Sequence, residues 1–160
     1  MNRRSINQTS VITALGLAIS LSSAMAQTTS LKDQLVGTWT LSSTDAYGSN
    51  PKGSYIFSPN GRFSAILMRN DLPKFTSNNR TQGTSAEYKA IVDGSLAYFG
   101  TYSVSGNELT LHVEGSTFAN WTGTDQKRTD VSVNGDEFKY IVPAPSGGGP
   151  ASPTIWKRAK

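Results

Sequence analysis

The sequence predicts an all-β domain in which eight antiparallel strands close into an up-and-down barrel, with a short N-terminal helix and one short amphipathic helix between strands three and four. Three observations predict it. Short segments that alternate apolar and polar residues recur along the chain. Tight turn signals, such as Pro59-Asn60-Gly61 and Asn134-Gly135, join neighbouring segments, as in a meander. The stretch LVGTWTLSS, at 35–43, places a glycine and a tryptophan where the first segment begins.

Closure of the sheet is preferred to its alternative, an open sandwich of two sheets. Eight up-and-down strands that close on themselves remove both sheet edges, which are otherwise sites of unwanted pairing. A barrel of that size has room for packed side chains or for one small ligand.

The first 26 residues are typical of a cleavable export signal. The chain opens with Arg3 and Arg4, continues with an apolar run at 11–23, and then offers the small-residue cleavage site Ala24-Met25-Ala26. The apolar run is too short to span a bilayer, which needs ~20 apolar residues. We therefore expect residues 1–26 to be a signal peptide and residues 27–160 to be the mature domain, periplasmic or secreted.

Composition excludes several classes of function. Cleavage removes two of the 15 basic residues and none of the 11 acidic ones, so the mature domain carries a net charge of only +2 and shows no basic tract. We expect no nucleic-acid partner and no stable membrane insertion. The chain has no cysteine, which excludes thiol catalysis, thiolate metal sites and disulfides. No metal site and no cofactor is predicted, and the oligomeric state is left open.

The first half of the chain opens with a short helix. Ser30 can cap it and Gly37 ends it. The alternation in GTWTLSST predicts the first strand, and Pro59-Asn60-Gly61 joins the next two strands into a hairpin. Residues 70–83 are polar and irregular and form the longest loop.

A second helix is predicted after that loop. Thr84 and Glu87 match a capping box, and Gly94 is a plausible C-terminal stop. Tyr88 and the pair at 91–92 recur at helical spacing, so we expect this helix to lie against the barrel.

The second half consists again of strands. Two turns, Ser105-Gly106-Asn107 and Asn134-Gly135, join strands, and residues 143–153 are too rich in proline and glycine for regular structure. The eight predicted strands span 37–44, 53–58, 62–69, 98–104, 108–115, 123–133, 137–142 and 154–159.

Gly37, Trp39 and Arg158 are predicted to seal one end of the barrel. One end of a small barrel must be closed, or water enters the core. Trp39 faces inward on the first strand, and the glycine before it lets the entering helix pass close. Closure places the last strand beside the first, so the Arg158 guanidinium can stack on the indole. The alternative is a solvated Arg158 in the tail.

Four stretches together resemble the lipocalin-like domain family of bacteria and fungi, which has a calycin-type barrel. They are LVGTWTLSS, NGRFSAILMR, YFGTYSVSGNELTLHVEGSTFANWTGTDQKR and IWKR, and the match runs from about Leu35 to Arg158. The resemblance implies a lipocalin-type barrel and no particular ligand. Family members often carry two successive histidines where this chain has Leu111-His112, a departure that argues against a catalytic role.

Several side chains are candidates for ligand contact. Three arginines near strand ends or loops could rim the barrel mouth and grip a carboxylate or phosphate bidentately, or could be ordinary solvated charges. Tyrosines on strands could add polar handles to an apolar pocket. His112, the only histidine, is expected to face outward. Phe118 and Trp121 could cover the entrance or tuck under the helix. The candidate ligand-binding residues are Arg69, Arg80, Arg128, Tyr55, Tyr98, Tyr102 and Tyr140.

Three functions remain open from the sequence. The preferred one is an exported protein that binds a small apolar or amphipathic molecule, with an anionic head as one option. The second is a cofactor-free isomerase or cyclase acting inside the barrel, although no catalytic motif is present and no catalytic residue is predicted. The third is a structural or interaction module with a filled core and no ligand.

Overall fold

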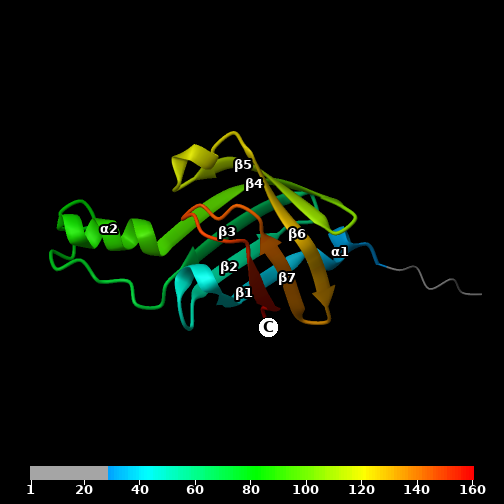
Figure 1. Ribbon diagram of the computed structural model, residues 1–160, viewed down its shortest axis with the longest axis horizontal. Coiled ribbons are helices and arrows are strands. Elements are labelled where there is room, and N and C mark those ends of the chain that lie inside the picture. Colours follow the sequence, from blue (N-terminus) through cyan, green and yellow to red (C-terminus); the bar gives the residue numbers. More distant parts are fainter. Residues whose placement is uncertain (1–28) are drawn as a thin grey trace, which may run out of the picture.

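The computed structural model describes residues 29–160 and consists of a single closed barrel (Figure 1). The predicted signal peptide at 1–26 lies outside the described residues. The strands are β1 Gly37–Thr44, β2 Lys52–Phe57, β3 Arg62–Met68, β4 Ser95–Ser105, β5 Glu108–Ser116, β6 Asp125–Asn134, β7 Glu137–Val142 and β8 Ser152–Arg158. The helices are α1 Leu31–Leu35 and α2 Ser85–Gly94, and two 3-10 turns are η1 Asp45–Tyr47 and η2 Ala119–Trp121.

Each strand pairs antiparallel with the next, and β8 returns to β1, where Trp39 lies opposite Arg158 and Leu41 opposite Trp156. The predicted eight-stranded barrel is therefore confirmed, and the open sandwich is excluded. β4 begins three residues earlier than predicted, at Ser95, because α2 continues into it without a connecting loop. Among the described residues, no helix is long and apolar enough to cross a membrane.

Aromatic side chains fill the barrel interior. The ring of Tyr55 stacks on Phe57, with centroids 4.3 Å apart, and lies edge-on to Trp156 at 5.3 Å. Phe138 contacts both Tyr55 and Phe57. The interior of the described barrel is thus a packed core over much of its length. The buried aromatic residues are Trp39, Tyr55, Phe57, Phe63, Tyr98, Tyr102, Trp121, Phe138, Tyr140 and Trp156.

The end of the barrel beside α1 is closed by Trp39. Its side chain is fully buried, and its indole N–H donates to the Leu35 carbonyl at 2.8 Å. The Arg158 guanidinium lies 4.1 Å from the centre of the indole ring and donates to the carbonyls of Gln34 and Val36 at 3.0 and 3.1 Å. Those carbonyls belong to the C-terminal end of α1, where the helix leaves them without partners of its own. One arginine therefore covers the indole and caps the helix.

The helix α2 does not lie against the barrel, contrary to the expectation from its apolar spacing. It projects beyond the barrel rim (Figure 1), and 75% of Val92 is exposed. The reason is geometric, because α2 leads directly into β4 and has no loop that could fold it back. The Tyr88 ring instead contacts Phe75 of the preceding loop, with centroids 5.6 Å apart.

Glu87 joins this helix to the long loop. Its carboxylate accepts hydrogen bonds from the backbone N–H of Thr84 at 2.7 Å and of Thr76 at 2.8 Å, and the Thr84 hydroxyl accepts from the Glu87 N–H at 3.2 Å. The predicted capping box is therefore present. The Thr84 and Thr76 backbone donors lower the pKa of Glu87 to about 2.

Glu87→Gln should release the loop from α2, because a neutral amide is a weaker acceptor for these N–H groups. At pH 7 the Thr76 and Thr84 amides should exchange with solvent faster in the variant. In the wild type the loop should loosen in the same way as the pH falls from about 4.3, the ordinary glutamate pKa, towards 2. A carboxyl group whose pKa is lowered by folding stabilises the folded state only while it is ionised. Asp93→Asn, which breaks only the exposed pair with Lys89, is the control. Equal exchange in all three proteins would contradict the prediction.

Gly100 marks a close approach of β4 to β5. A Cβ atom built there would lie 1.9 Å from the His112 carbonyl oxygen and 2.9 Å from the Glu114 nitrogen, beside a shift in strand register. Because both obstacles are backbone atoms, Gly100→Ala should lower the free energy of unfolding by about 3 kcal/mol or more, measured by urea denaturation. Gly147→Ala, where a Cβ meets nothing within 4 Å, should leave it unchanged. A Gly100→Ala variant as stable as the wild type would disprove the close approach.

Candidate functional site

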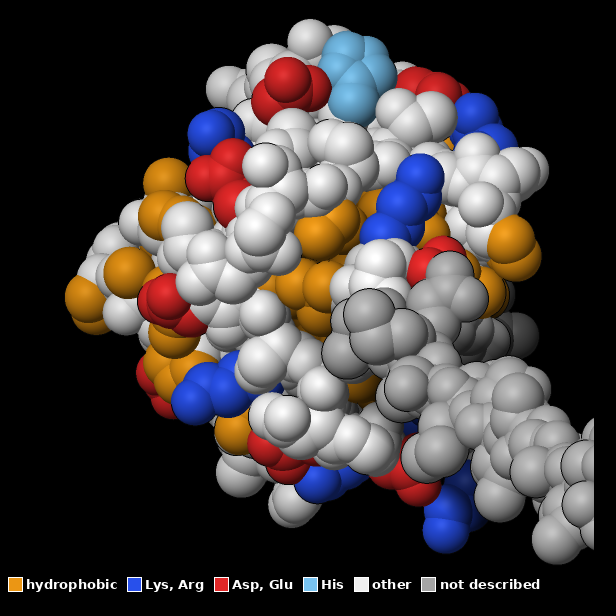
Figure 2. Space-filling view, turned by 90° about the vertical axis from the view of Figure 1, so that its right-hand side faces the viewer, with side chains coloured by type: hydrophobic (Ala, Val, Ile, Leu, Met, Phe, Trp, Pro, Cys, Tyr) orange, Lys and Arg blue, Asp and Glu red, His pale blue; other side chains and the backbone are white. Residues whose placement is uncertain are grey.

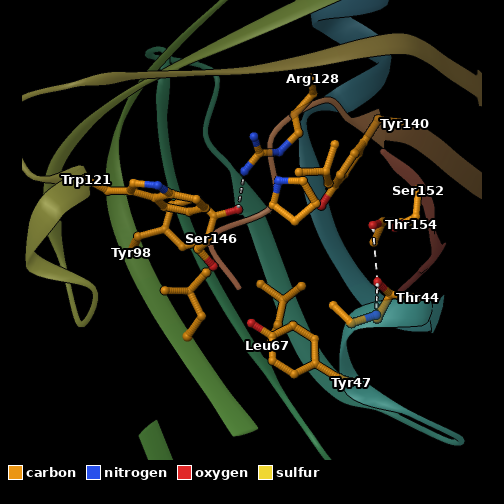
Figure 3. A pocket seen from close by; sticks show the side chains of 14 residues that line it. Thr44, Tyr47, Leu67, Tyr98, Trp121, Arg128, Tyr140, Ser146, Ser152 and Thr154 are labelled. Atoms are coloured by element: carbon orange, nitrogen blue, oxygen red, sulfur yellow. Dashed lines mark hydrogen bonds between the residues drawn. The ribbon is translucent and has the colours of Figure 1, made fainter. Parts of the chain in front are cut away.

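A pocket opens at the end of the barrel opposite Trp39 (Figure 3). Its rim is formed by the last residues of β1, β3 and β7 and the first residues of β4 and β8. Residues 145 and 146 of the β7–β8 loop also line it. The space between the lining atoms measures about 440 Å³, but this value includes solvent at the open mouth. The free volume of the cavity itself is about 50 Å³. A single water needs roughly 10–15 Å³ of such volume, so the cavity holds a few waters.

Among residues 29–160, Arg128 is the only charged side chain that lines this pocket. It points inward from β6 opposite Leu109 and is 2% exposed. One terminal N–H group donates to the Lys127 carbonyl at 2.8 Å and the other to the Tyr98 hydroxyl at 3.3 Å, while Nε has no partner within the described chain. The guanidinium carbon lies 5.6 Å from the Trp121 ring and 5.7 Å from the Tyr140 ring.

The guanidinium has no counter-charge in the part of the chain that the structure describes. Each salt bridge there joins other residues, and none includes Arg128. Arginine keeps its proton in proteins, so its burial here does not remove the charge. The site therefore holds a permanent, buried and unpaired positive charge.

The surrounding tyrosines are neutral hydrogen-bonding groups at physiological pH. Burial raises the pKa of Tyr47 to about 12 and that of Tyr140 further, and it raises the pKa of Tyr55 well above its ordinary value. Two more buried donors, the Tyr55 hydroxyl and the Trp156 indole N–H, lack partners within residues 29–160. Three buried polar groups in this half of the described barrel, Arg128 Nε among them, therefore lack a hydrogen-bond partner.

The structure brings three of the seven predicted ligand-binding residues to this pocket, namely Arg128, Tyr98 and Tyr140. Tyr55 lies in the core and its ring contacts Tyr98, with centroids 6.5 Å apart. Tyr102 is in the other half of the barrel, where its hydroxyl donates to the Ser58 carbonyl at 3.2 Å.

Arg69 and Arg80 do not line the pocket, so the expected rim of three arginines does not form. Arg69 is exposed and makes a bidentate pair with Asp71 at 2.9 and 2.8 Å, because β3 ends just before it and turns it outward. Arg80 is exposed in the loop before α2. Of the three arginines, only the one inside a strand is buried.

Two further expectations concern His112 and Trp121. His112 faces outward, as the alternation predicts, and its imidazole lies 2.8 Å from the Asp125 carboxylate. Figure 2 shows the histidine side chain, in pale blue, on the surface. Trp121 lies over the pocket rather than under α2, with its ring 5.3 Å from that of Tyr98. Sequence reasoning missed Tyr47 and Pro145, because both lie in irregular segments where no periodicity indicates which way a side chain points.

Comparison with known proteins assigns the chain to a family. The sequence model of the lipocalin-like domain matches residues 36–159. The crystal structure of a lipocalin-like protein from Bacteroides uniformis is 16% identical, covers 79% of this chain and 99% of its own, and gives a TM-score of 0.41. A mutant of the fluorescent protein UnaG is 9% identical, covers 79% and 96%, and gives a TM-score of 0.37. No curated protein sequence matches the chain. With a family match over nearly the whole described barrel, the chain belongs to the lipocalin-like domain family.

Proposed function

We propose that this protein is exported and binds a small amphipathic molecule whose anionic head pairs with Arg128 in the mouth of the barrel. The observation that supports this most directly is the charge of the pocket, a buried guanidinium with no carboxylate near it in the described chain. Burying an unpaired charge costs several kcal/mol. An incoming anion offsets that cost and supplies the missing acceptors.

The rest of the pocket suits the apolar part of such a molecule. Leu67, Leu96 and Val142 line it together with aromatic rings. Ligand sites generally combine apolar walls with a few polar groups that fix orientation. The head therefore lies at Arg128 and the apolar part points towards the rim.

Access to Arg128 requires the β7–β8 loop, residues 143–151, to move. Pro145 and Ser146 line the pocket. Figure 3 shows Ser146 among the side chains that surround it. The backbone bond found for this loop is internal, from the Gly148 N–H to the Pro145 carbonyl at 3.0 Å. Within the described chain, no backbone hydrogen bond ties residues 143–151 to the barrel, and all of them except Pro145 are exposed, so displacing the loop costs little.

Calorimetry with simple carboxylates and their matched amides tests the proposal. Wild-type protein should bind the acids and not the amides. Arg128→Met should weaken acid binding by about 30-fold or more, since loss of one partner of a buried charge pair costs 2–5 kcal/mol. Arg69→Met should bind as the wild type does. Equal binding of acids and amides, or of acids to all three proteins, would overturn the proposal.

Export rests on the sequence of residues 1–26. Protein recovered from host cells should begin at Gln27, which intact mass measurement reveals directly. A mass that includes the first 26 residues would contradict export by cleavage.

The small free volume, about 50 Å³, favours a second candidate, a module with a filled core and no ligand. Native mass spectrometry of protein purified from its host distinguishes the two candidates, because a binding protein should carry a bound mass that disappears in Arg128→Met.

A further inference from the structure

The walls of the pocket are unusually aromatic for so small a space. Tyr47, Tyr98, Trp121 and Tyr140 all line it. In Figure 3, Trp121 and Tyr98 lie on one side and Tyr140 on the other, with Arg128 between them. A flat ring that enters between these faces makes edge and face contacts, which add about 0.5–1.5 kcal/mol per aromatic pair beyond the burial of area.

Trp121 is held rigidly where it meets such a ring. It ends the short turn η2, in which its N–H donates to the Phe118 carbonyl at 3.0 Å and its own carbonyl accepts from the Thr124 hydroxyl at 2.8 Å. Its indole lies edge-on to the Tyr98 ring at 5.3 Å and to the Phe118 ring at 6.0 Å. An aromatic wall that is already in place loses little conformational entropy when a ligand binds.

The head-group site carries a single positive charge. Arg128 supplies it, and burial raises the pKa values of Tyr140 and Tyr55, so these two side chains add no charge. One guanidinium can neutralise one negative charge. A dianion such as a phosphate monoester would leave its second charge buried and unpaired, which is costly.

We infer that the ligand is a planar aromatic monocarboxylate of about one ring, with Trp121 as the residue that selects the ring. The inference depends on the proposed binding function and narrows it. The size follows from the pocket, whose free volume of about 50 Å³ must grow by displacement of the β7–β8 loop to admit even one ring. The carboxylate pairs with Arg128, and the ring lies against Trp121 with its far edge under residues 145 and 146.

Benzoate and cyclohexanecarboxylate test the inference, because they share the head group and a six-membered ring but only the ring of benzoate is flat and aromatic. Wild-type protein should bind benzoate about five- to tenfold more tightly, as the contribution of an aromatic pair implies. Trp121→Leu should reduce that ratio clearly, leaving only the share of the remaining tyrosines, whereas Trp121→Phe should keep most of it. The ratio is insensitive to a general loss of stability, because both ligands meet the same variant.

The outcomes separate the inference from the function on which it depends. If both acids bind the wild type equally, and both need Arg128, the protein binds anions but does not select a ring. If phenyl phosphate binds more tightly than benzoate at a pH where it is doubly charged, the single-charge argument is wrong. If benzamide binds as well as benzoate, or neither acid binds, the proposed function itself fails.

Discussion

Arg128→Met should raise the free energy of unfolding of the empty barrel by about 1–4 kcal/mol, although it removes the central group of the proposed site. Arg128 is 2% exposed and has no acidic partner within residues 29–160, so the folded protein bears the cost of desolvating its charge. Methionine fills a similar volume and makes favourable contacts with aromatic rings. Urea denaturation of the two proteins at pH 7 measures the difference.

Two control variants test whether the gain in stability comes from removing the buried charge. Arg128→Lys keeps the buried charge but loses the planar fork that reaches Tyr98, so it should be no more stable than the wild type. Arg69→Met removes an exposed arginine and should leave the stability nearly unchanged. A clear loss of stability in Arg128→Met would mean that the guanidinium holds the barrel together, and that a structural role, not ligand binding, explains its burial.

The barrel could be predicted from the sequence because its signals are local. Alternation and turn residues specify each hairpin, and the capping residues of α2 specify where that helix begins. The position of α2 could not be predicted from its apolar spacing, because Tyr88 finds its partner in the neighbouring loop. Helical periodicity shows that a face is apolar but does not show what covers it.

The site could be predicted only in part, because burial of a charge depends on the strand that carries it. Arg128 was one of three candidate arginines, and nothing local distinguished it from Arg69. Arg128 is buried because β6 keeps its regular strand pairing at this residue, which lies opposite Leu109 of β5. The pairing register of β6 shifts only after it, between Thr129 and Ser132. An irregularity two residues earlier would have turned it to solvent.

Trp39→Ala should lower the free energy of unfolding by about 3–5 kcal/mol. The indole is fully buried, contacts Phe138 with ring centroids 5.3 Å apart, and donates to the Leu35 carbonyl. Its removal leaves a cavity between α1 and the core that the closed barrel cannot collapse to fill. Since domains of this kind are stable by only 5–15 kcal/mol, thermal unfolding should occur at a much lower temperature. Trp121→Ala, at the open mouth, should cost clearly less, because solvent and the β7–β8 loop can fill its place.

The contribution of the stacked guanidinium is separable from that of the indole by a double-mutant cycle. Trp39→Leu, Arg158→Met and the double variant should show a coupling of about 0.5–2 kcal/mol in unfolding free energy, the range for a cation over an aromatic ring. Arg158→Met alone should cost more than this coupling, because it also frees the Gln34 and Val36 carbonyls at the end of α1. A coupling near zero would show that Arg158 acts only as a helix cap. The barrel would then be closed by the indole alone, and the covering cation would contribute nothing to the seal that keeps water from the packed end.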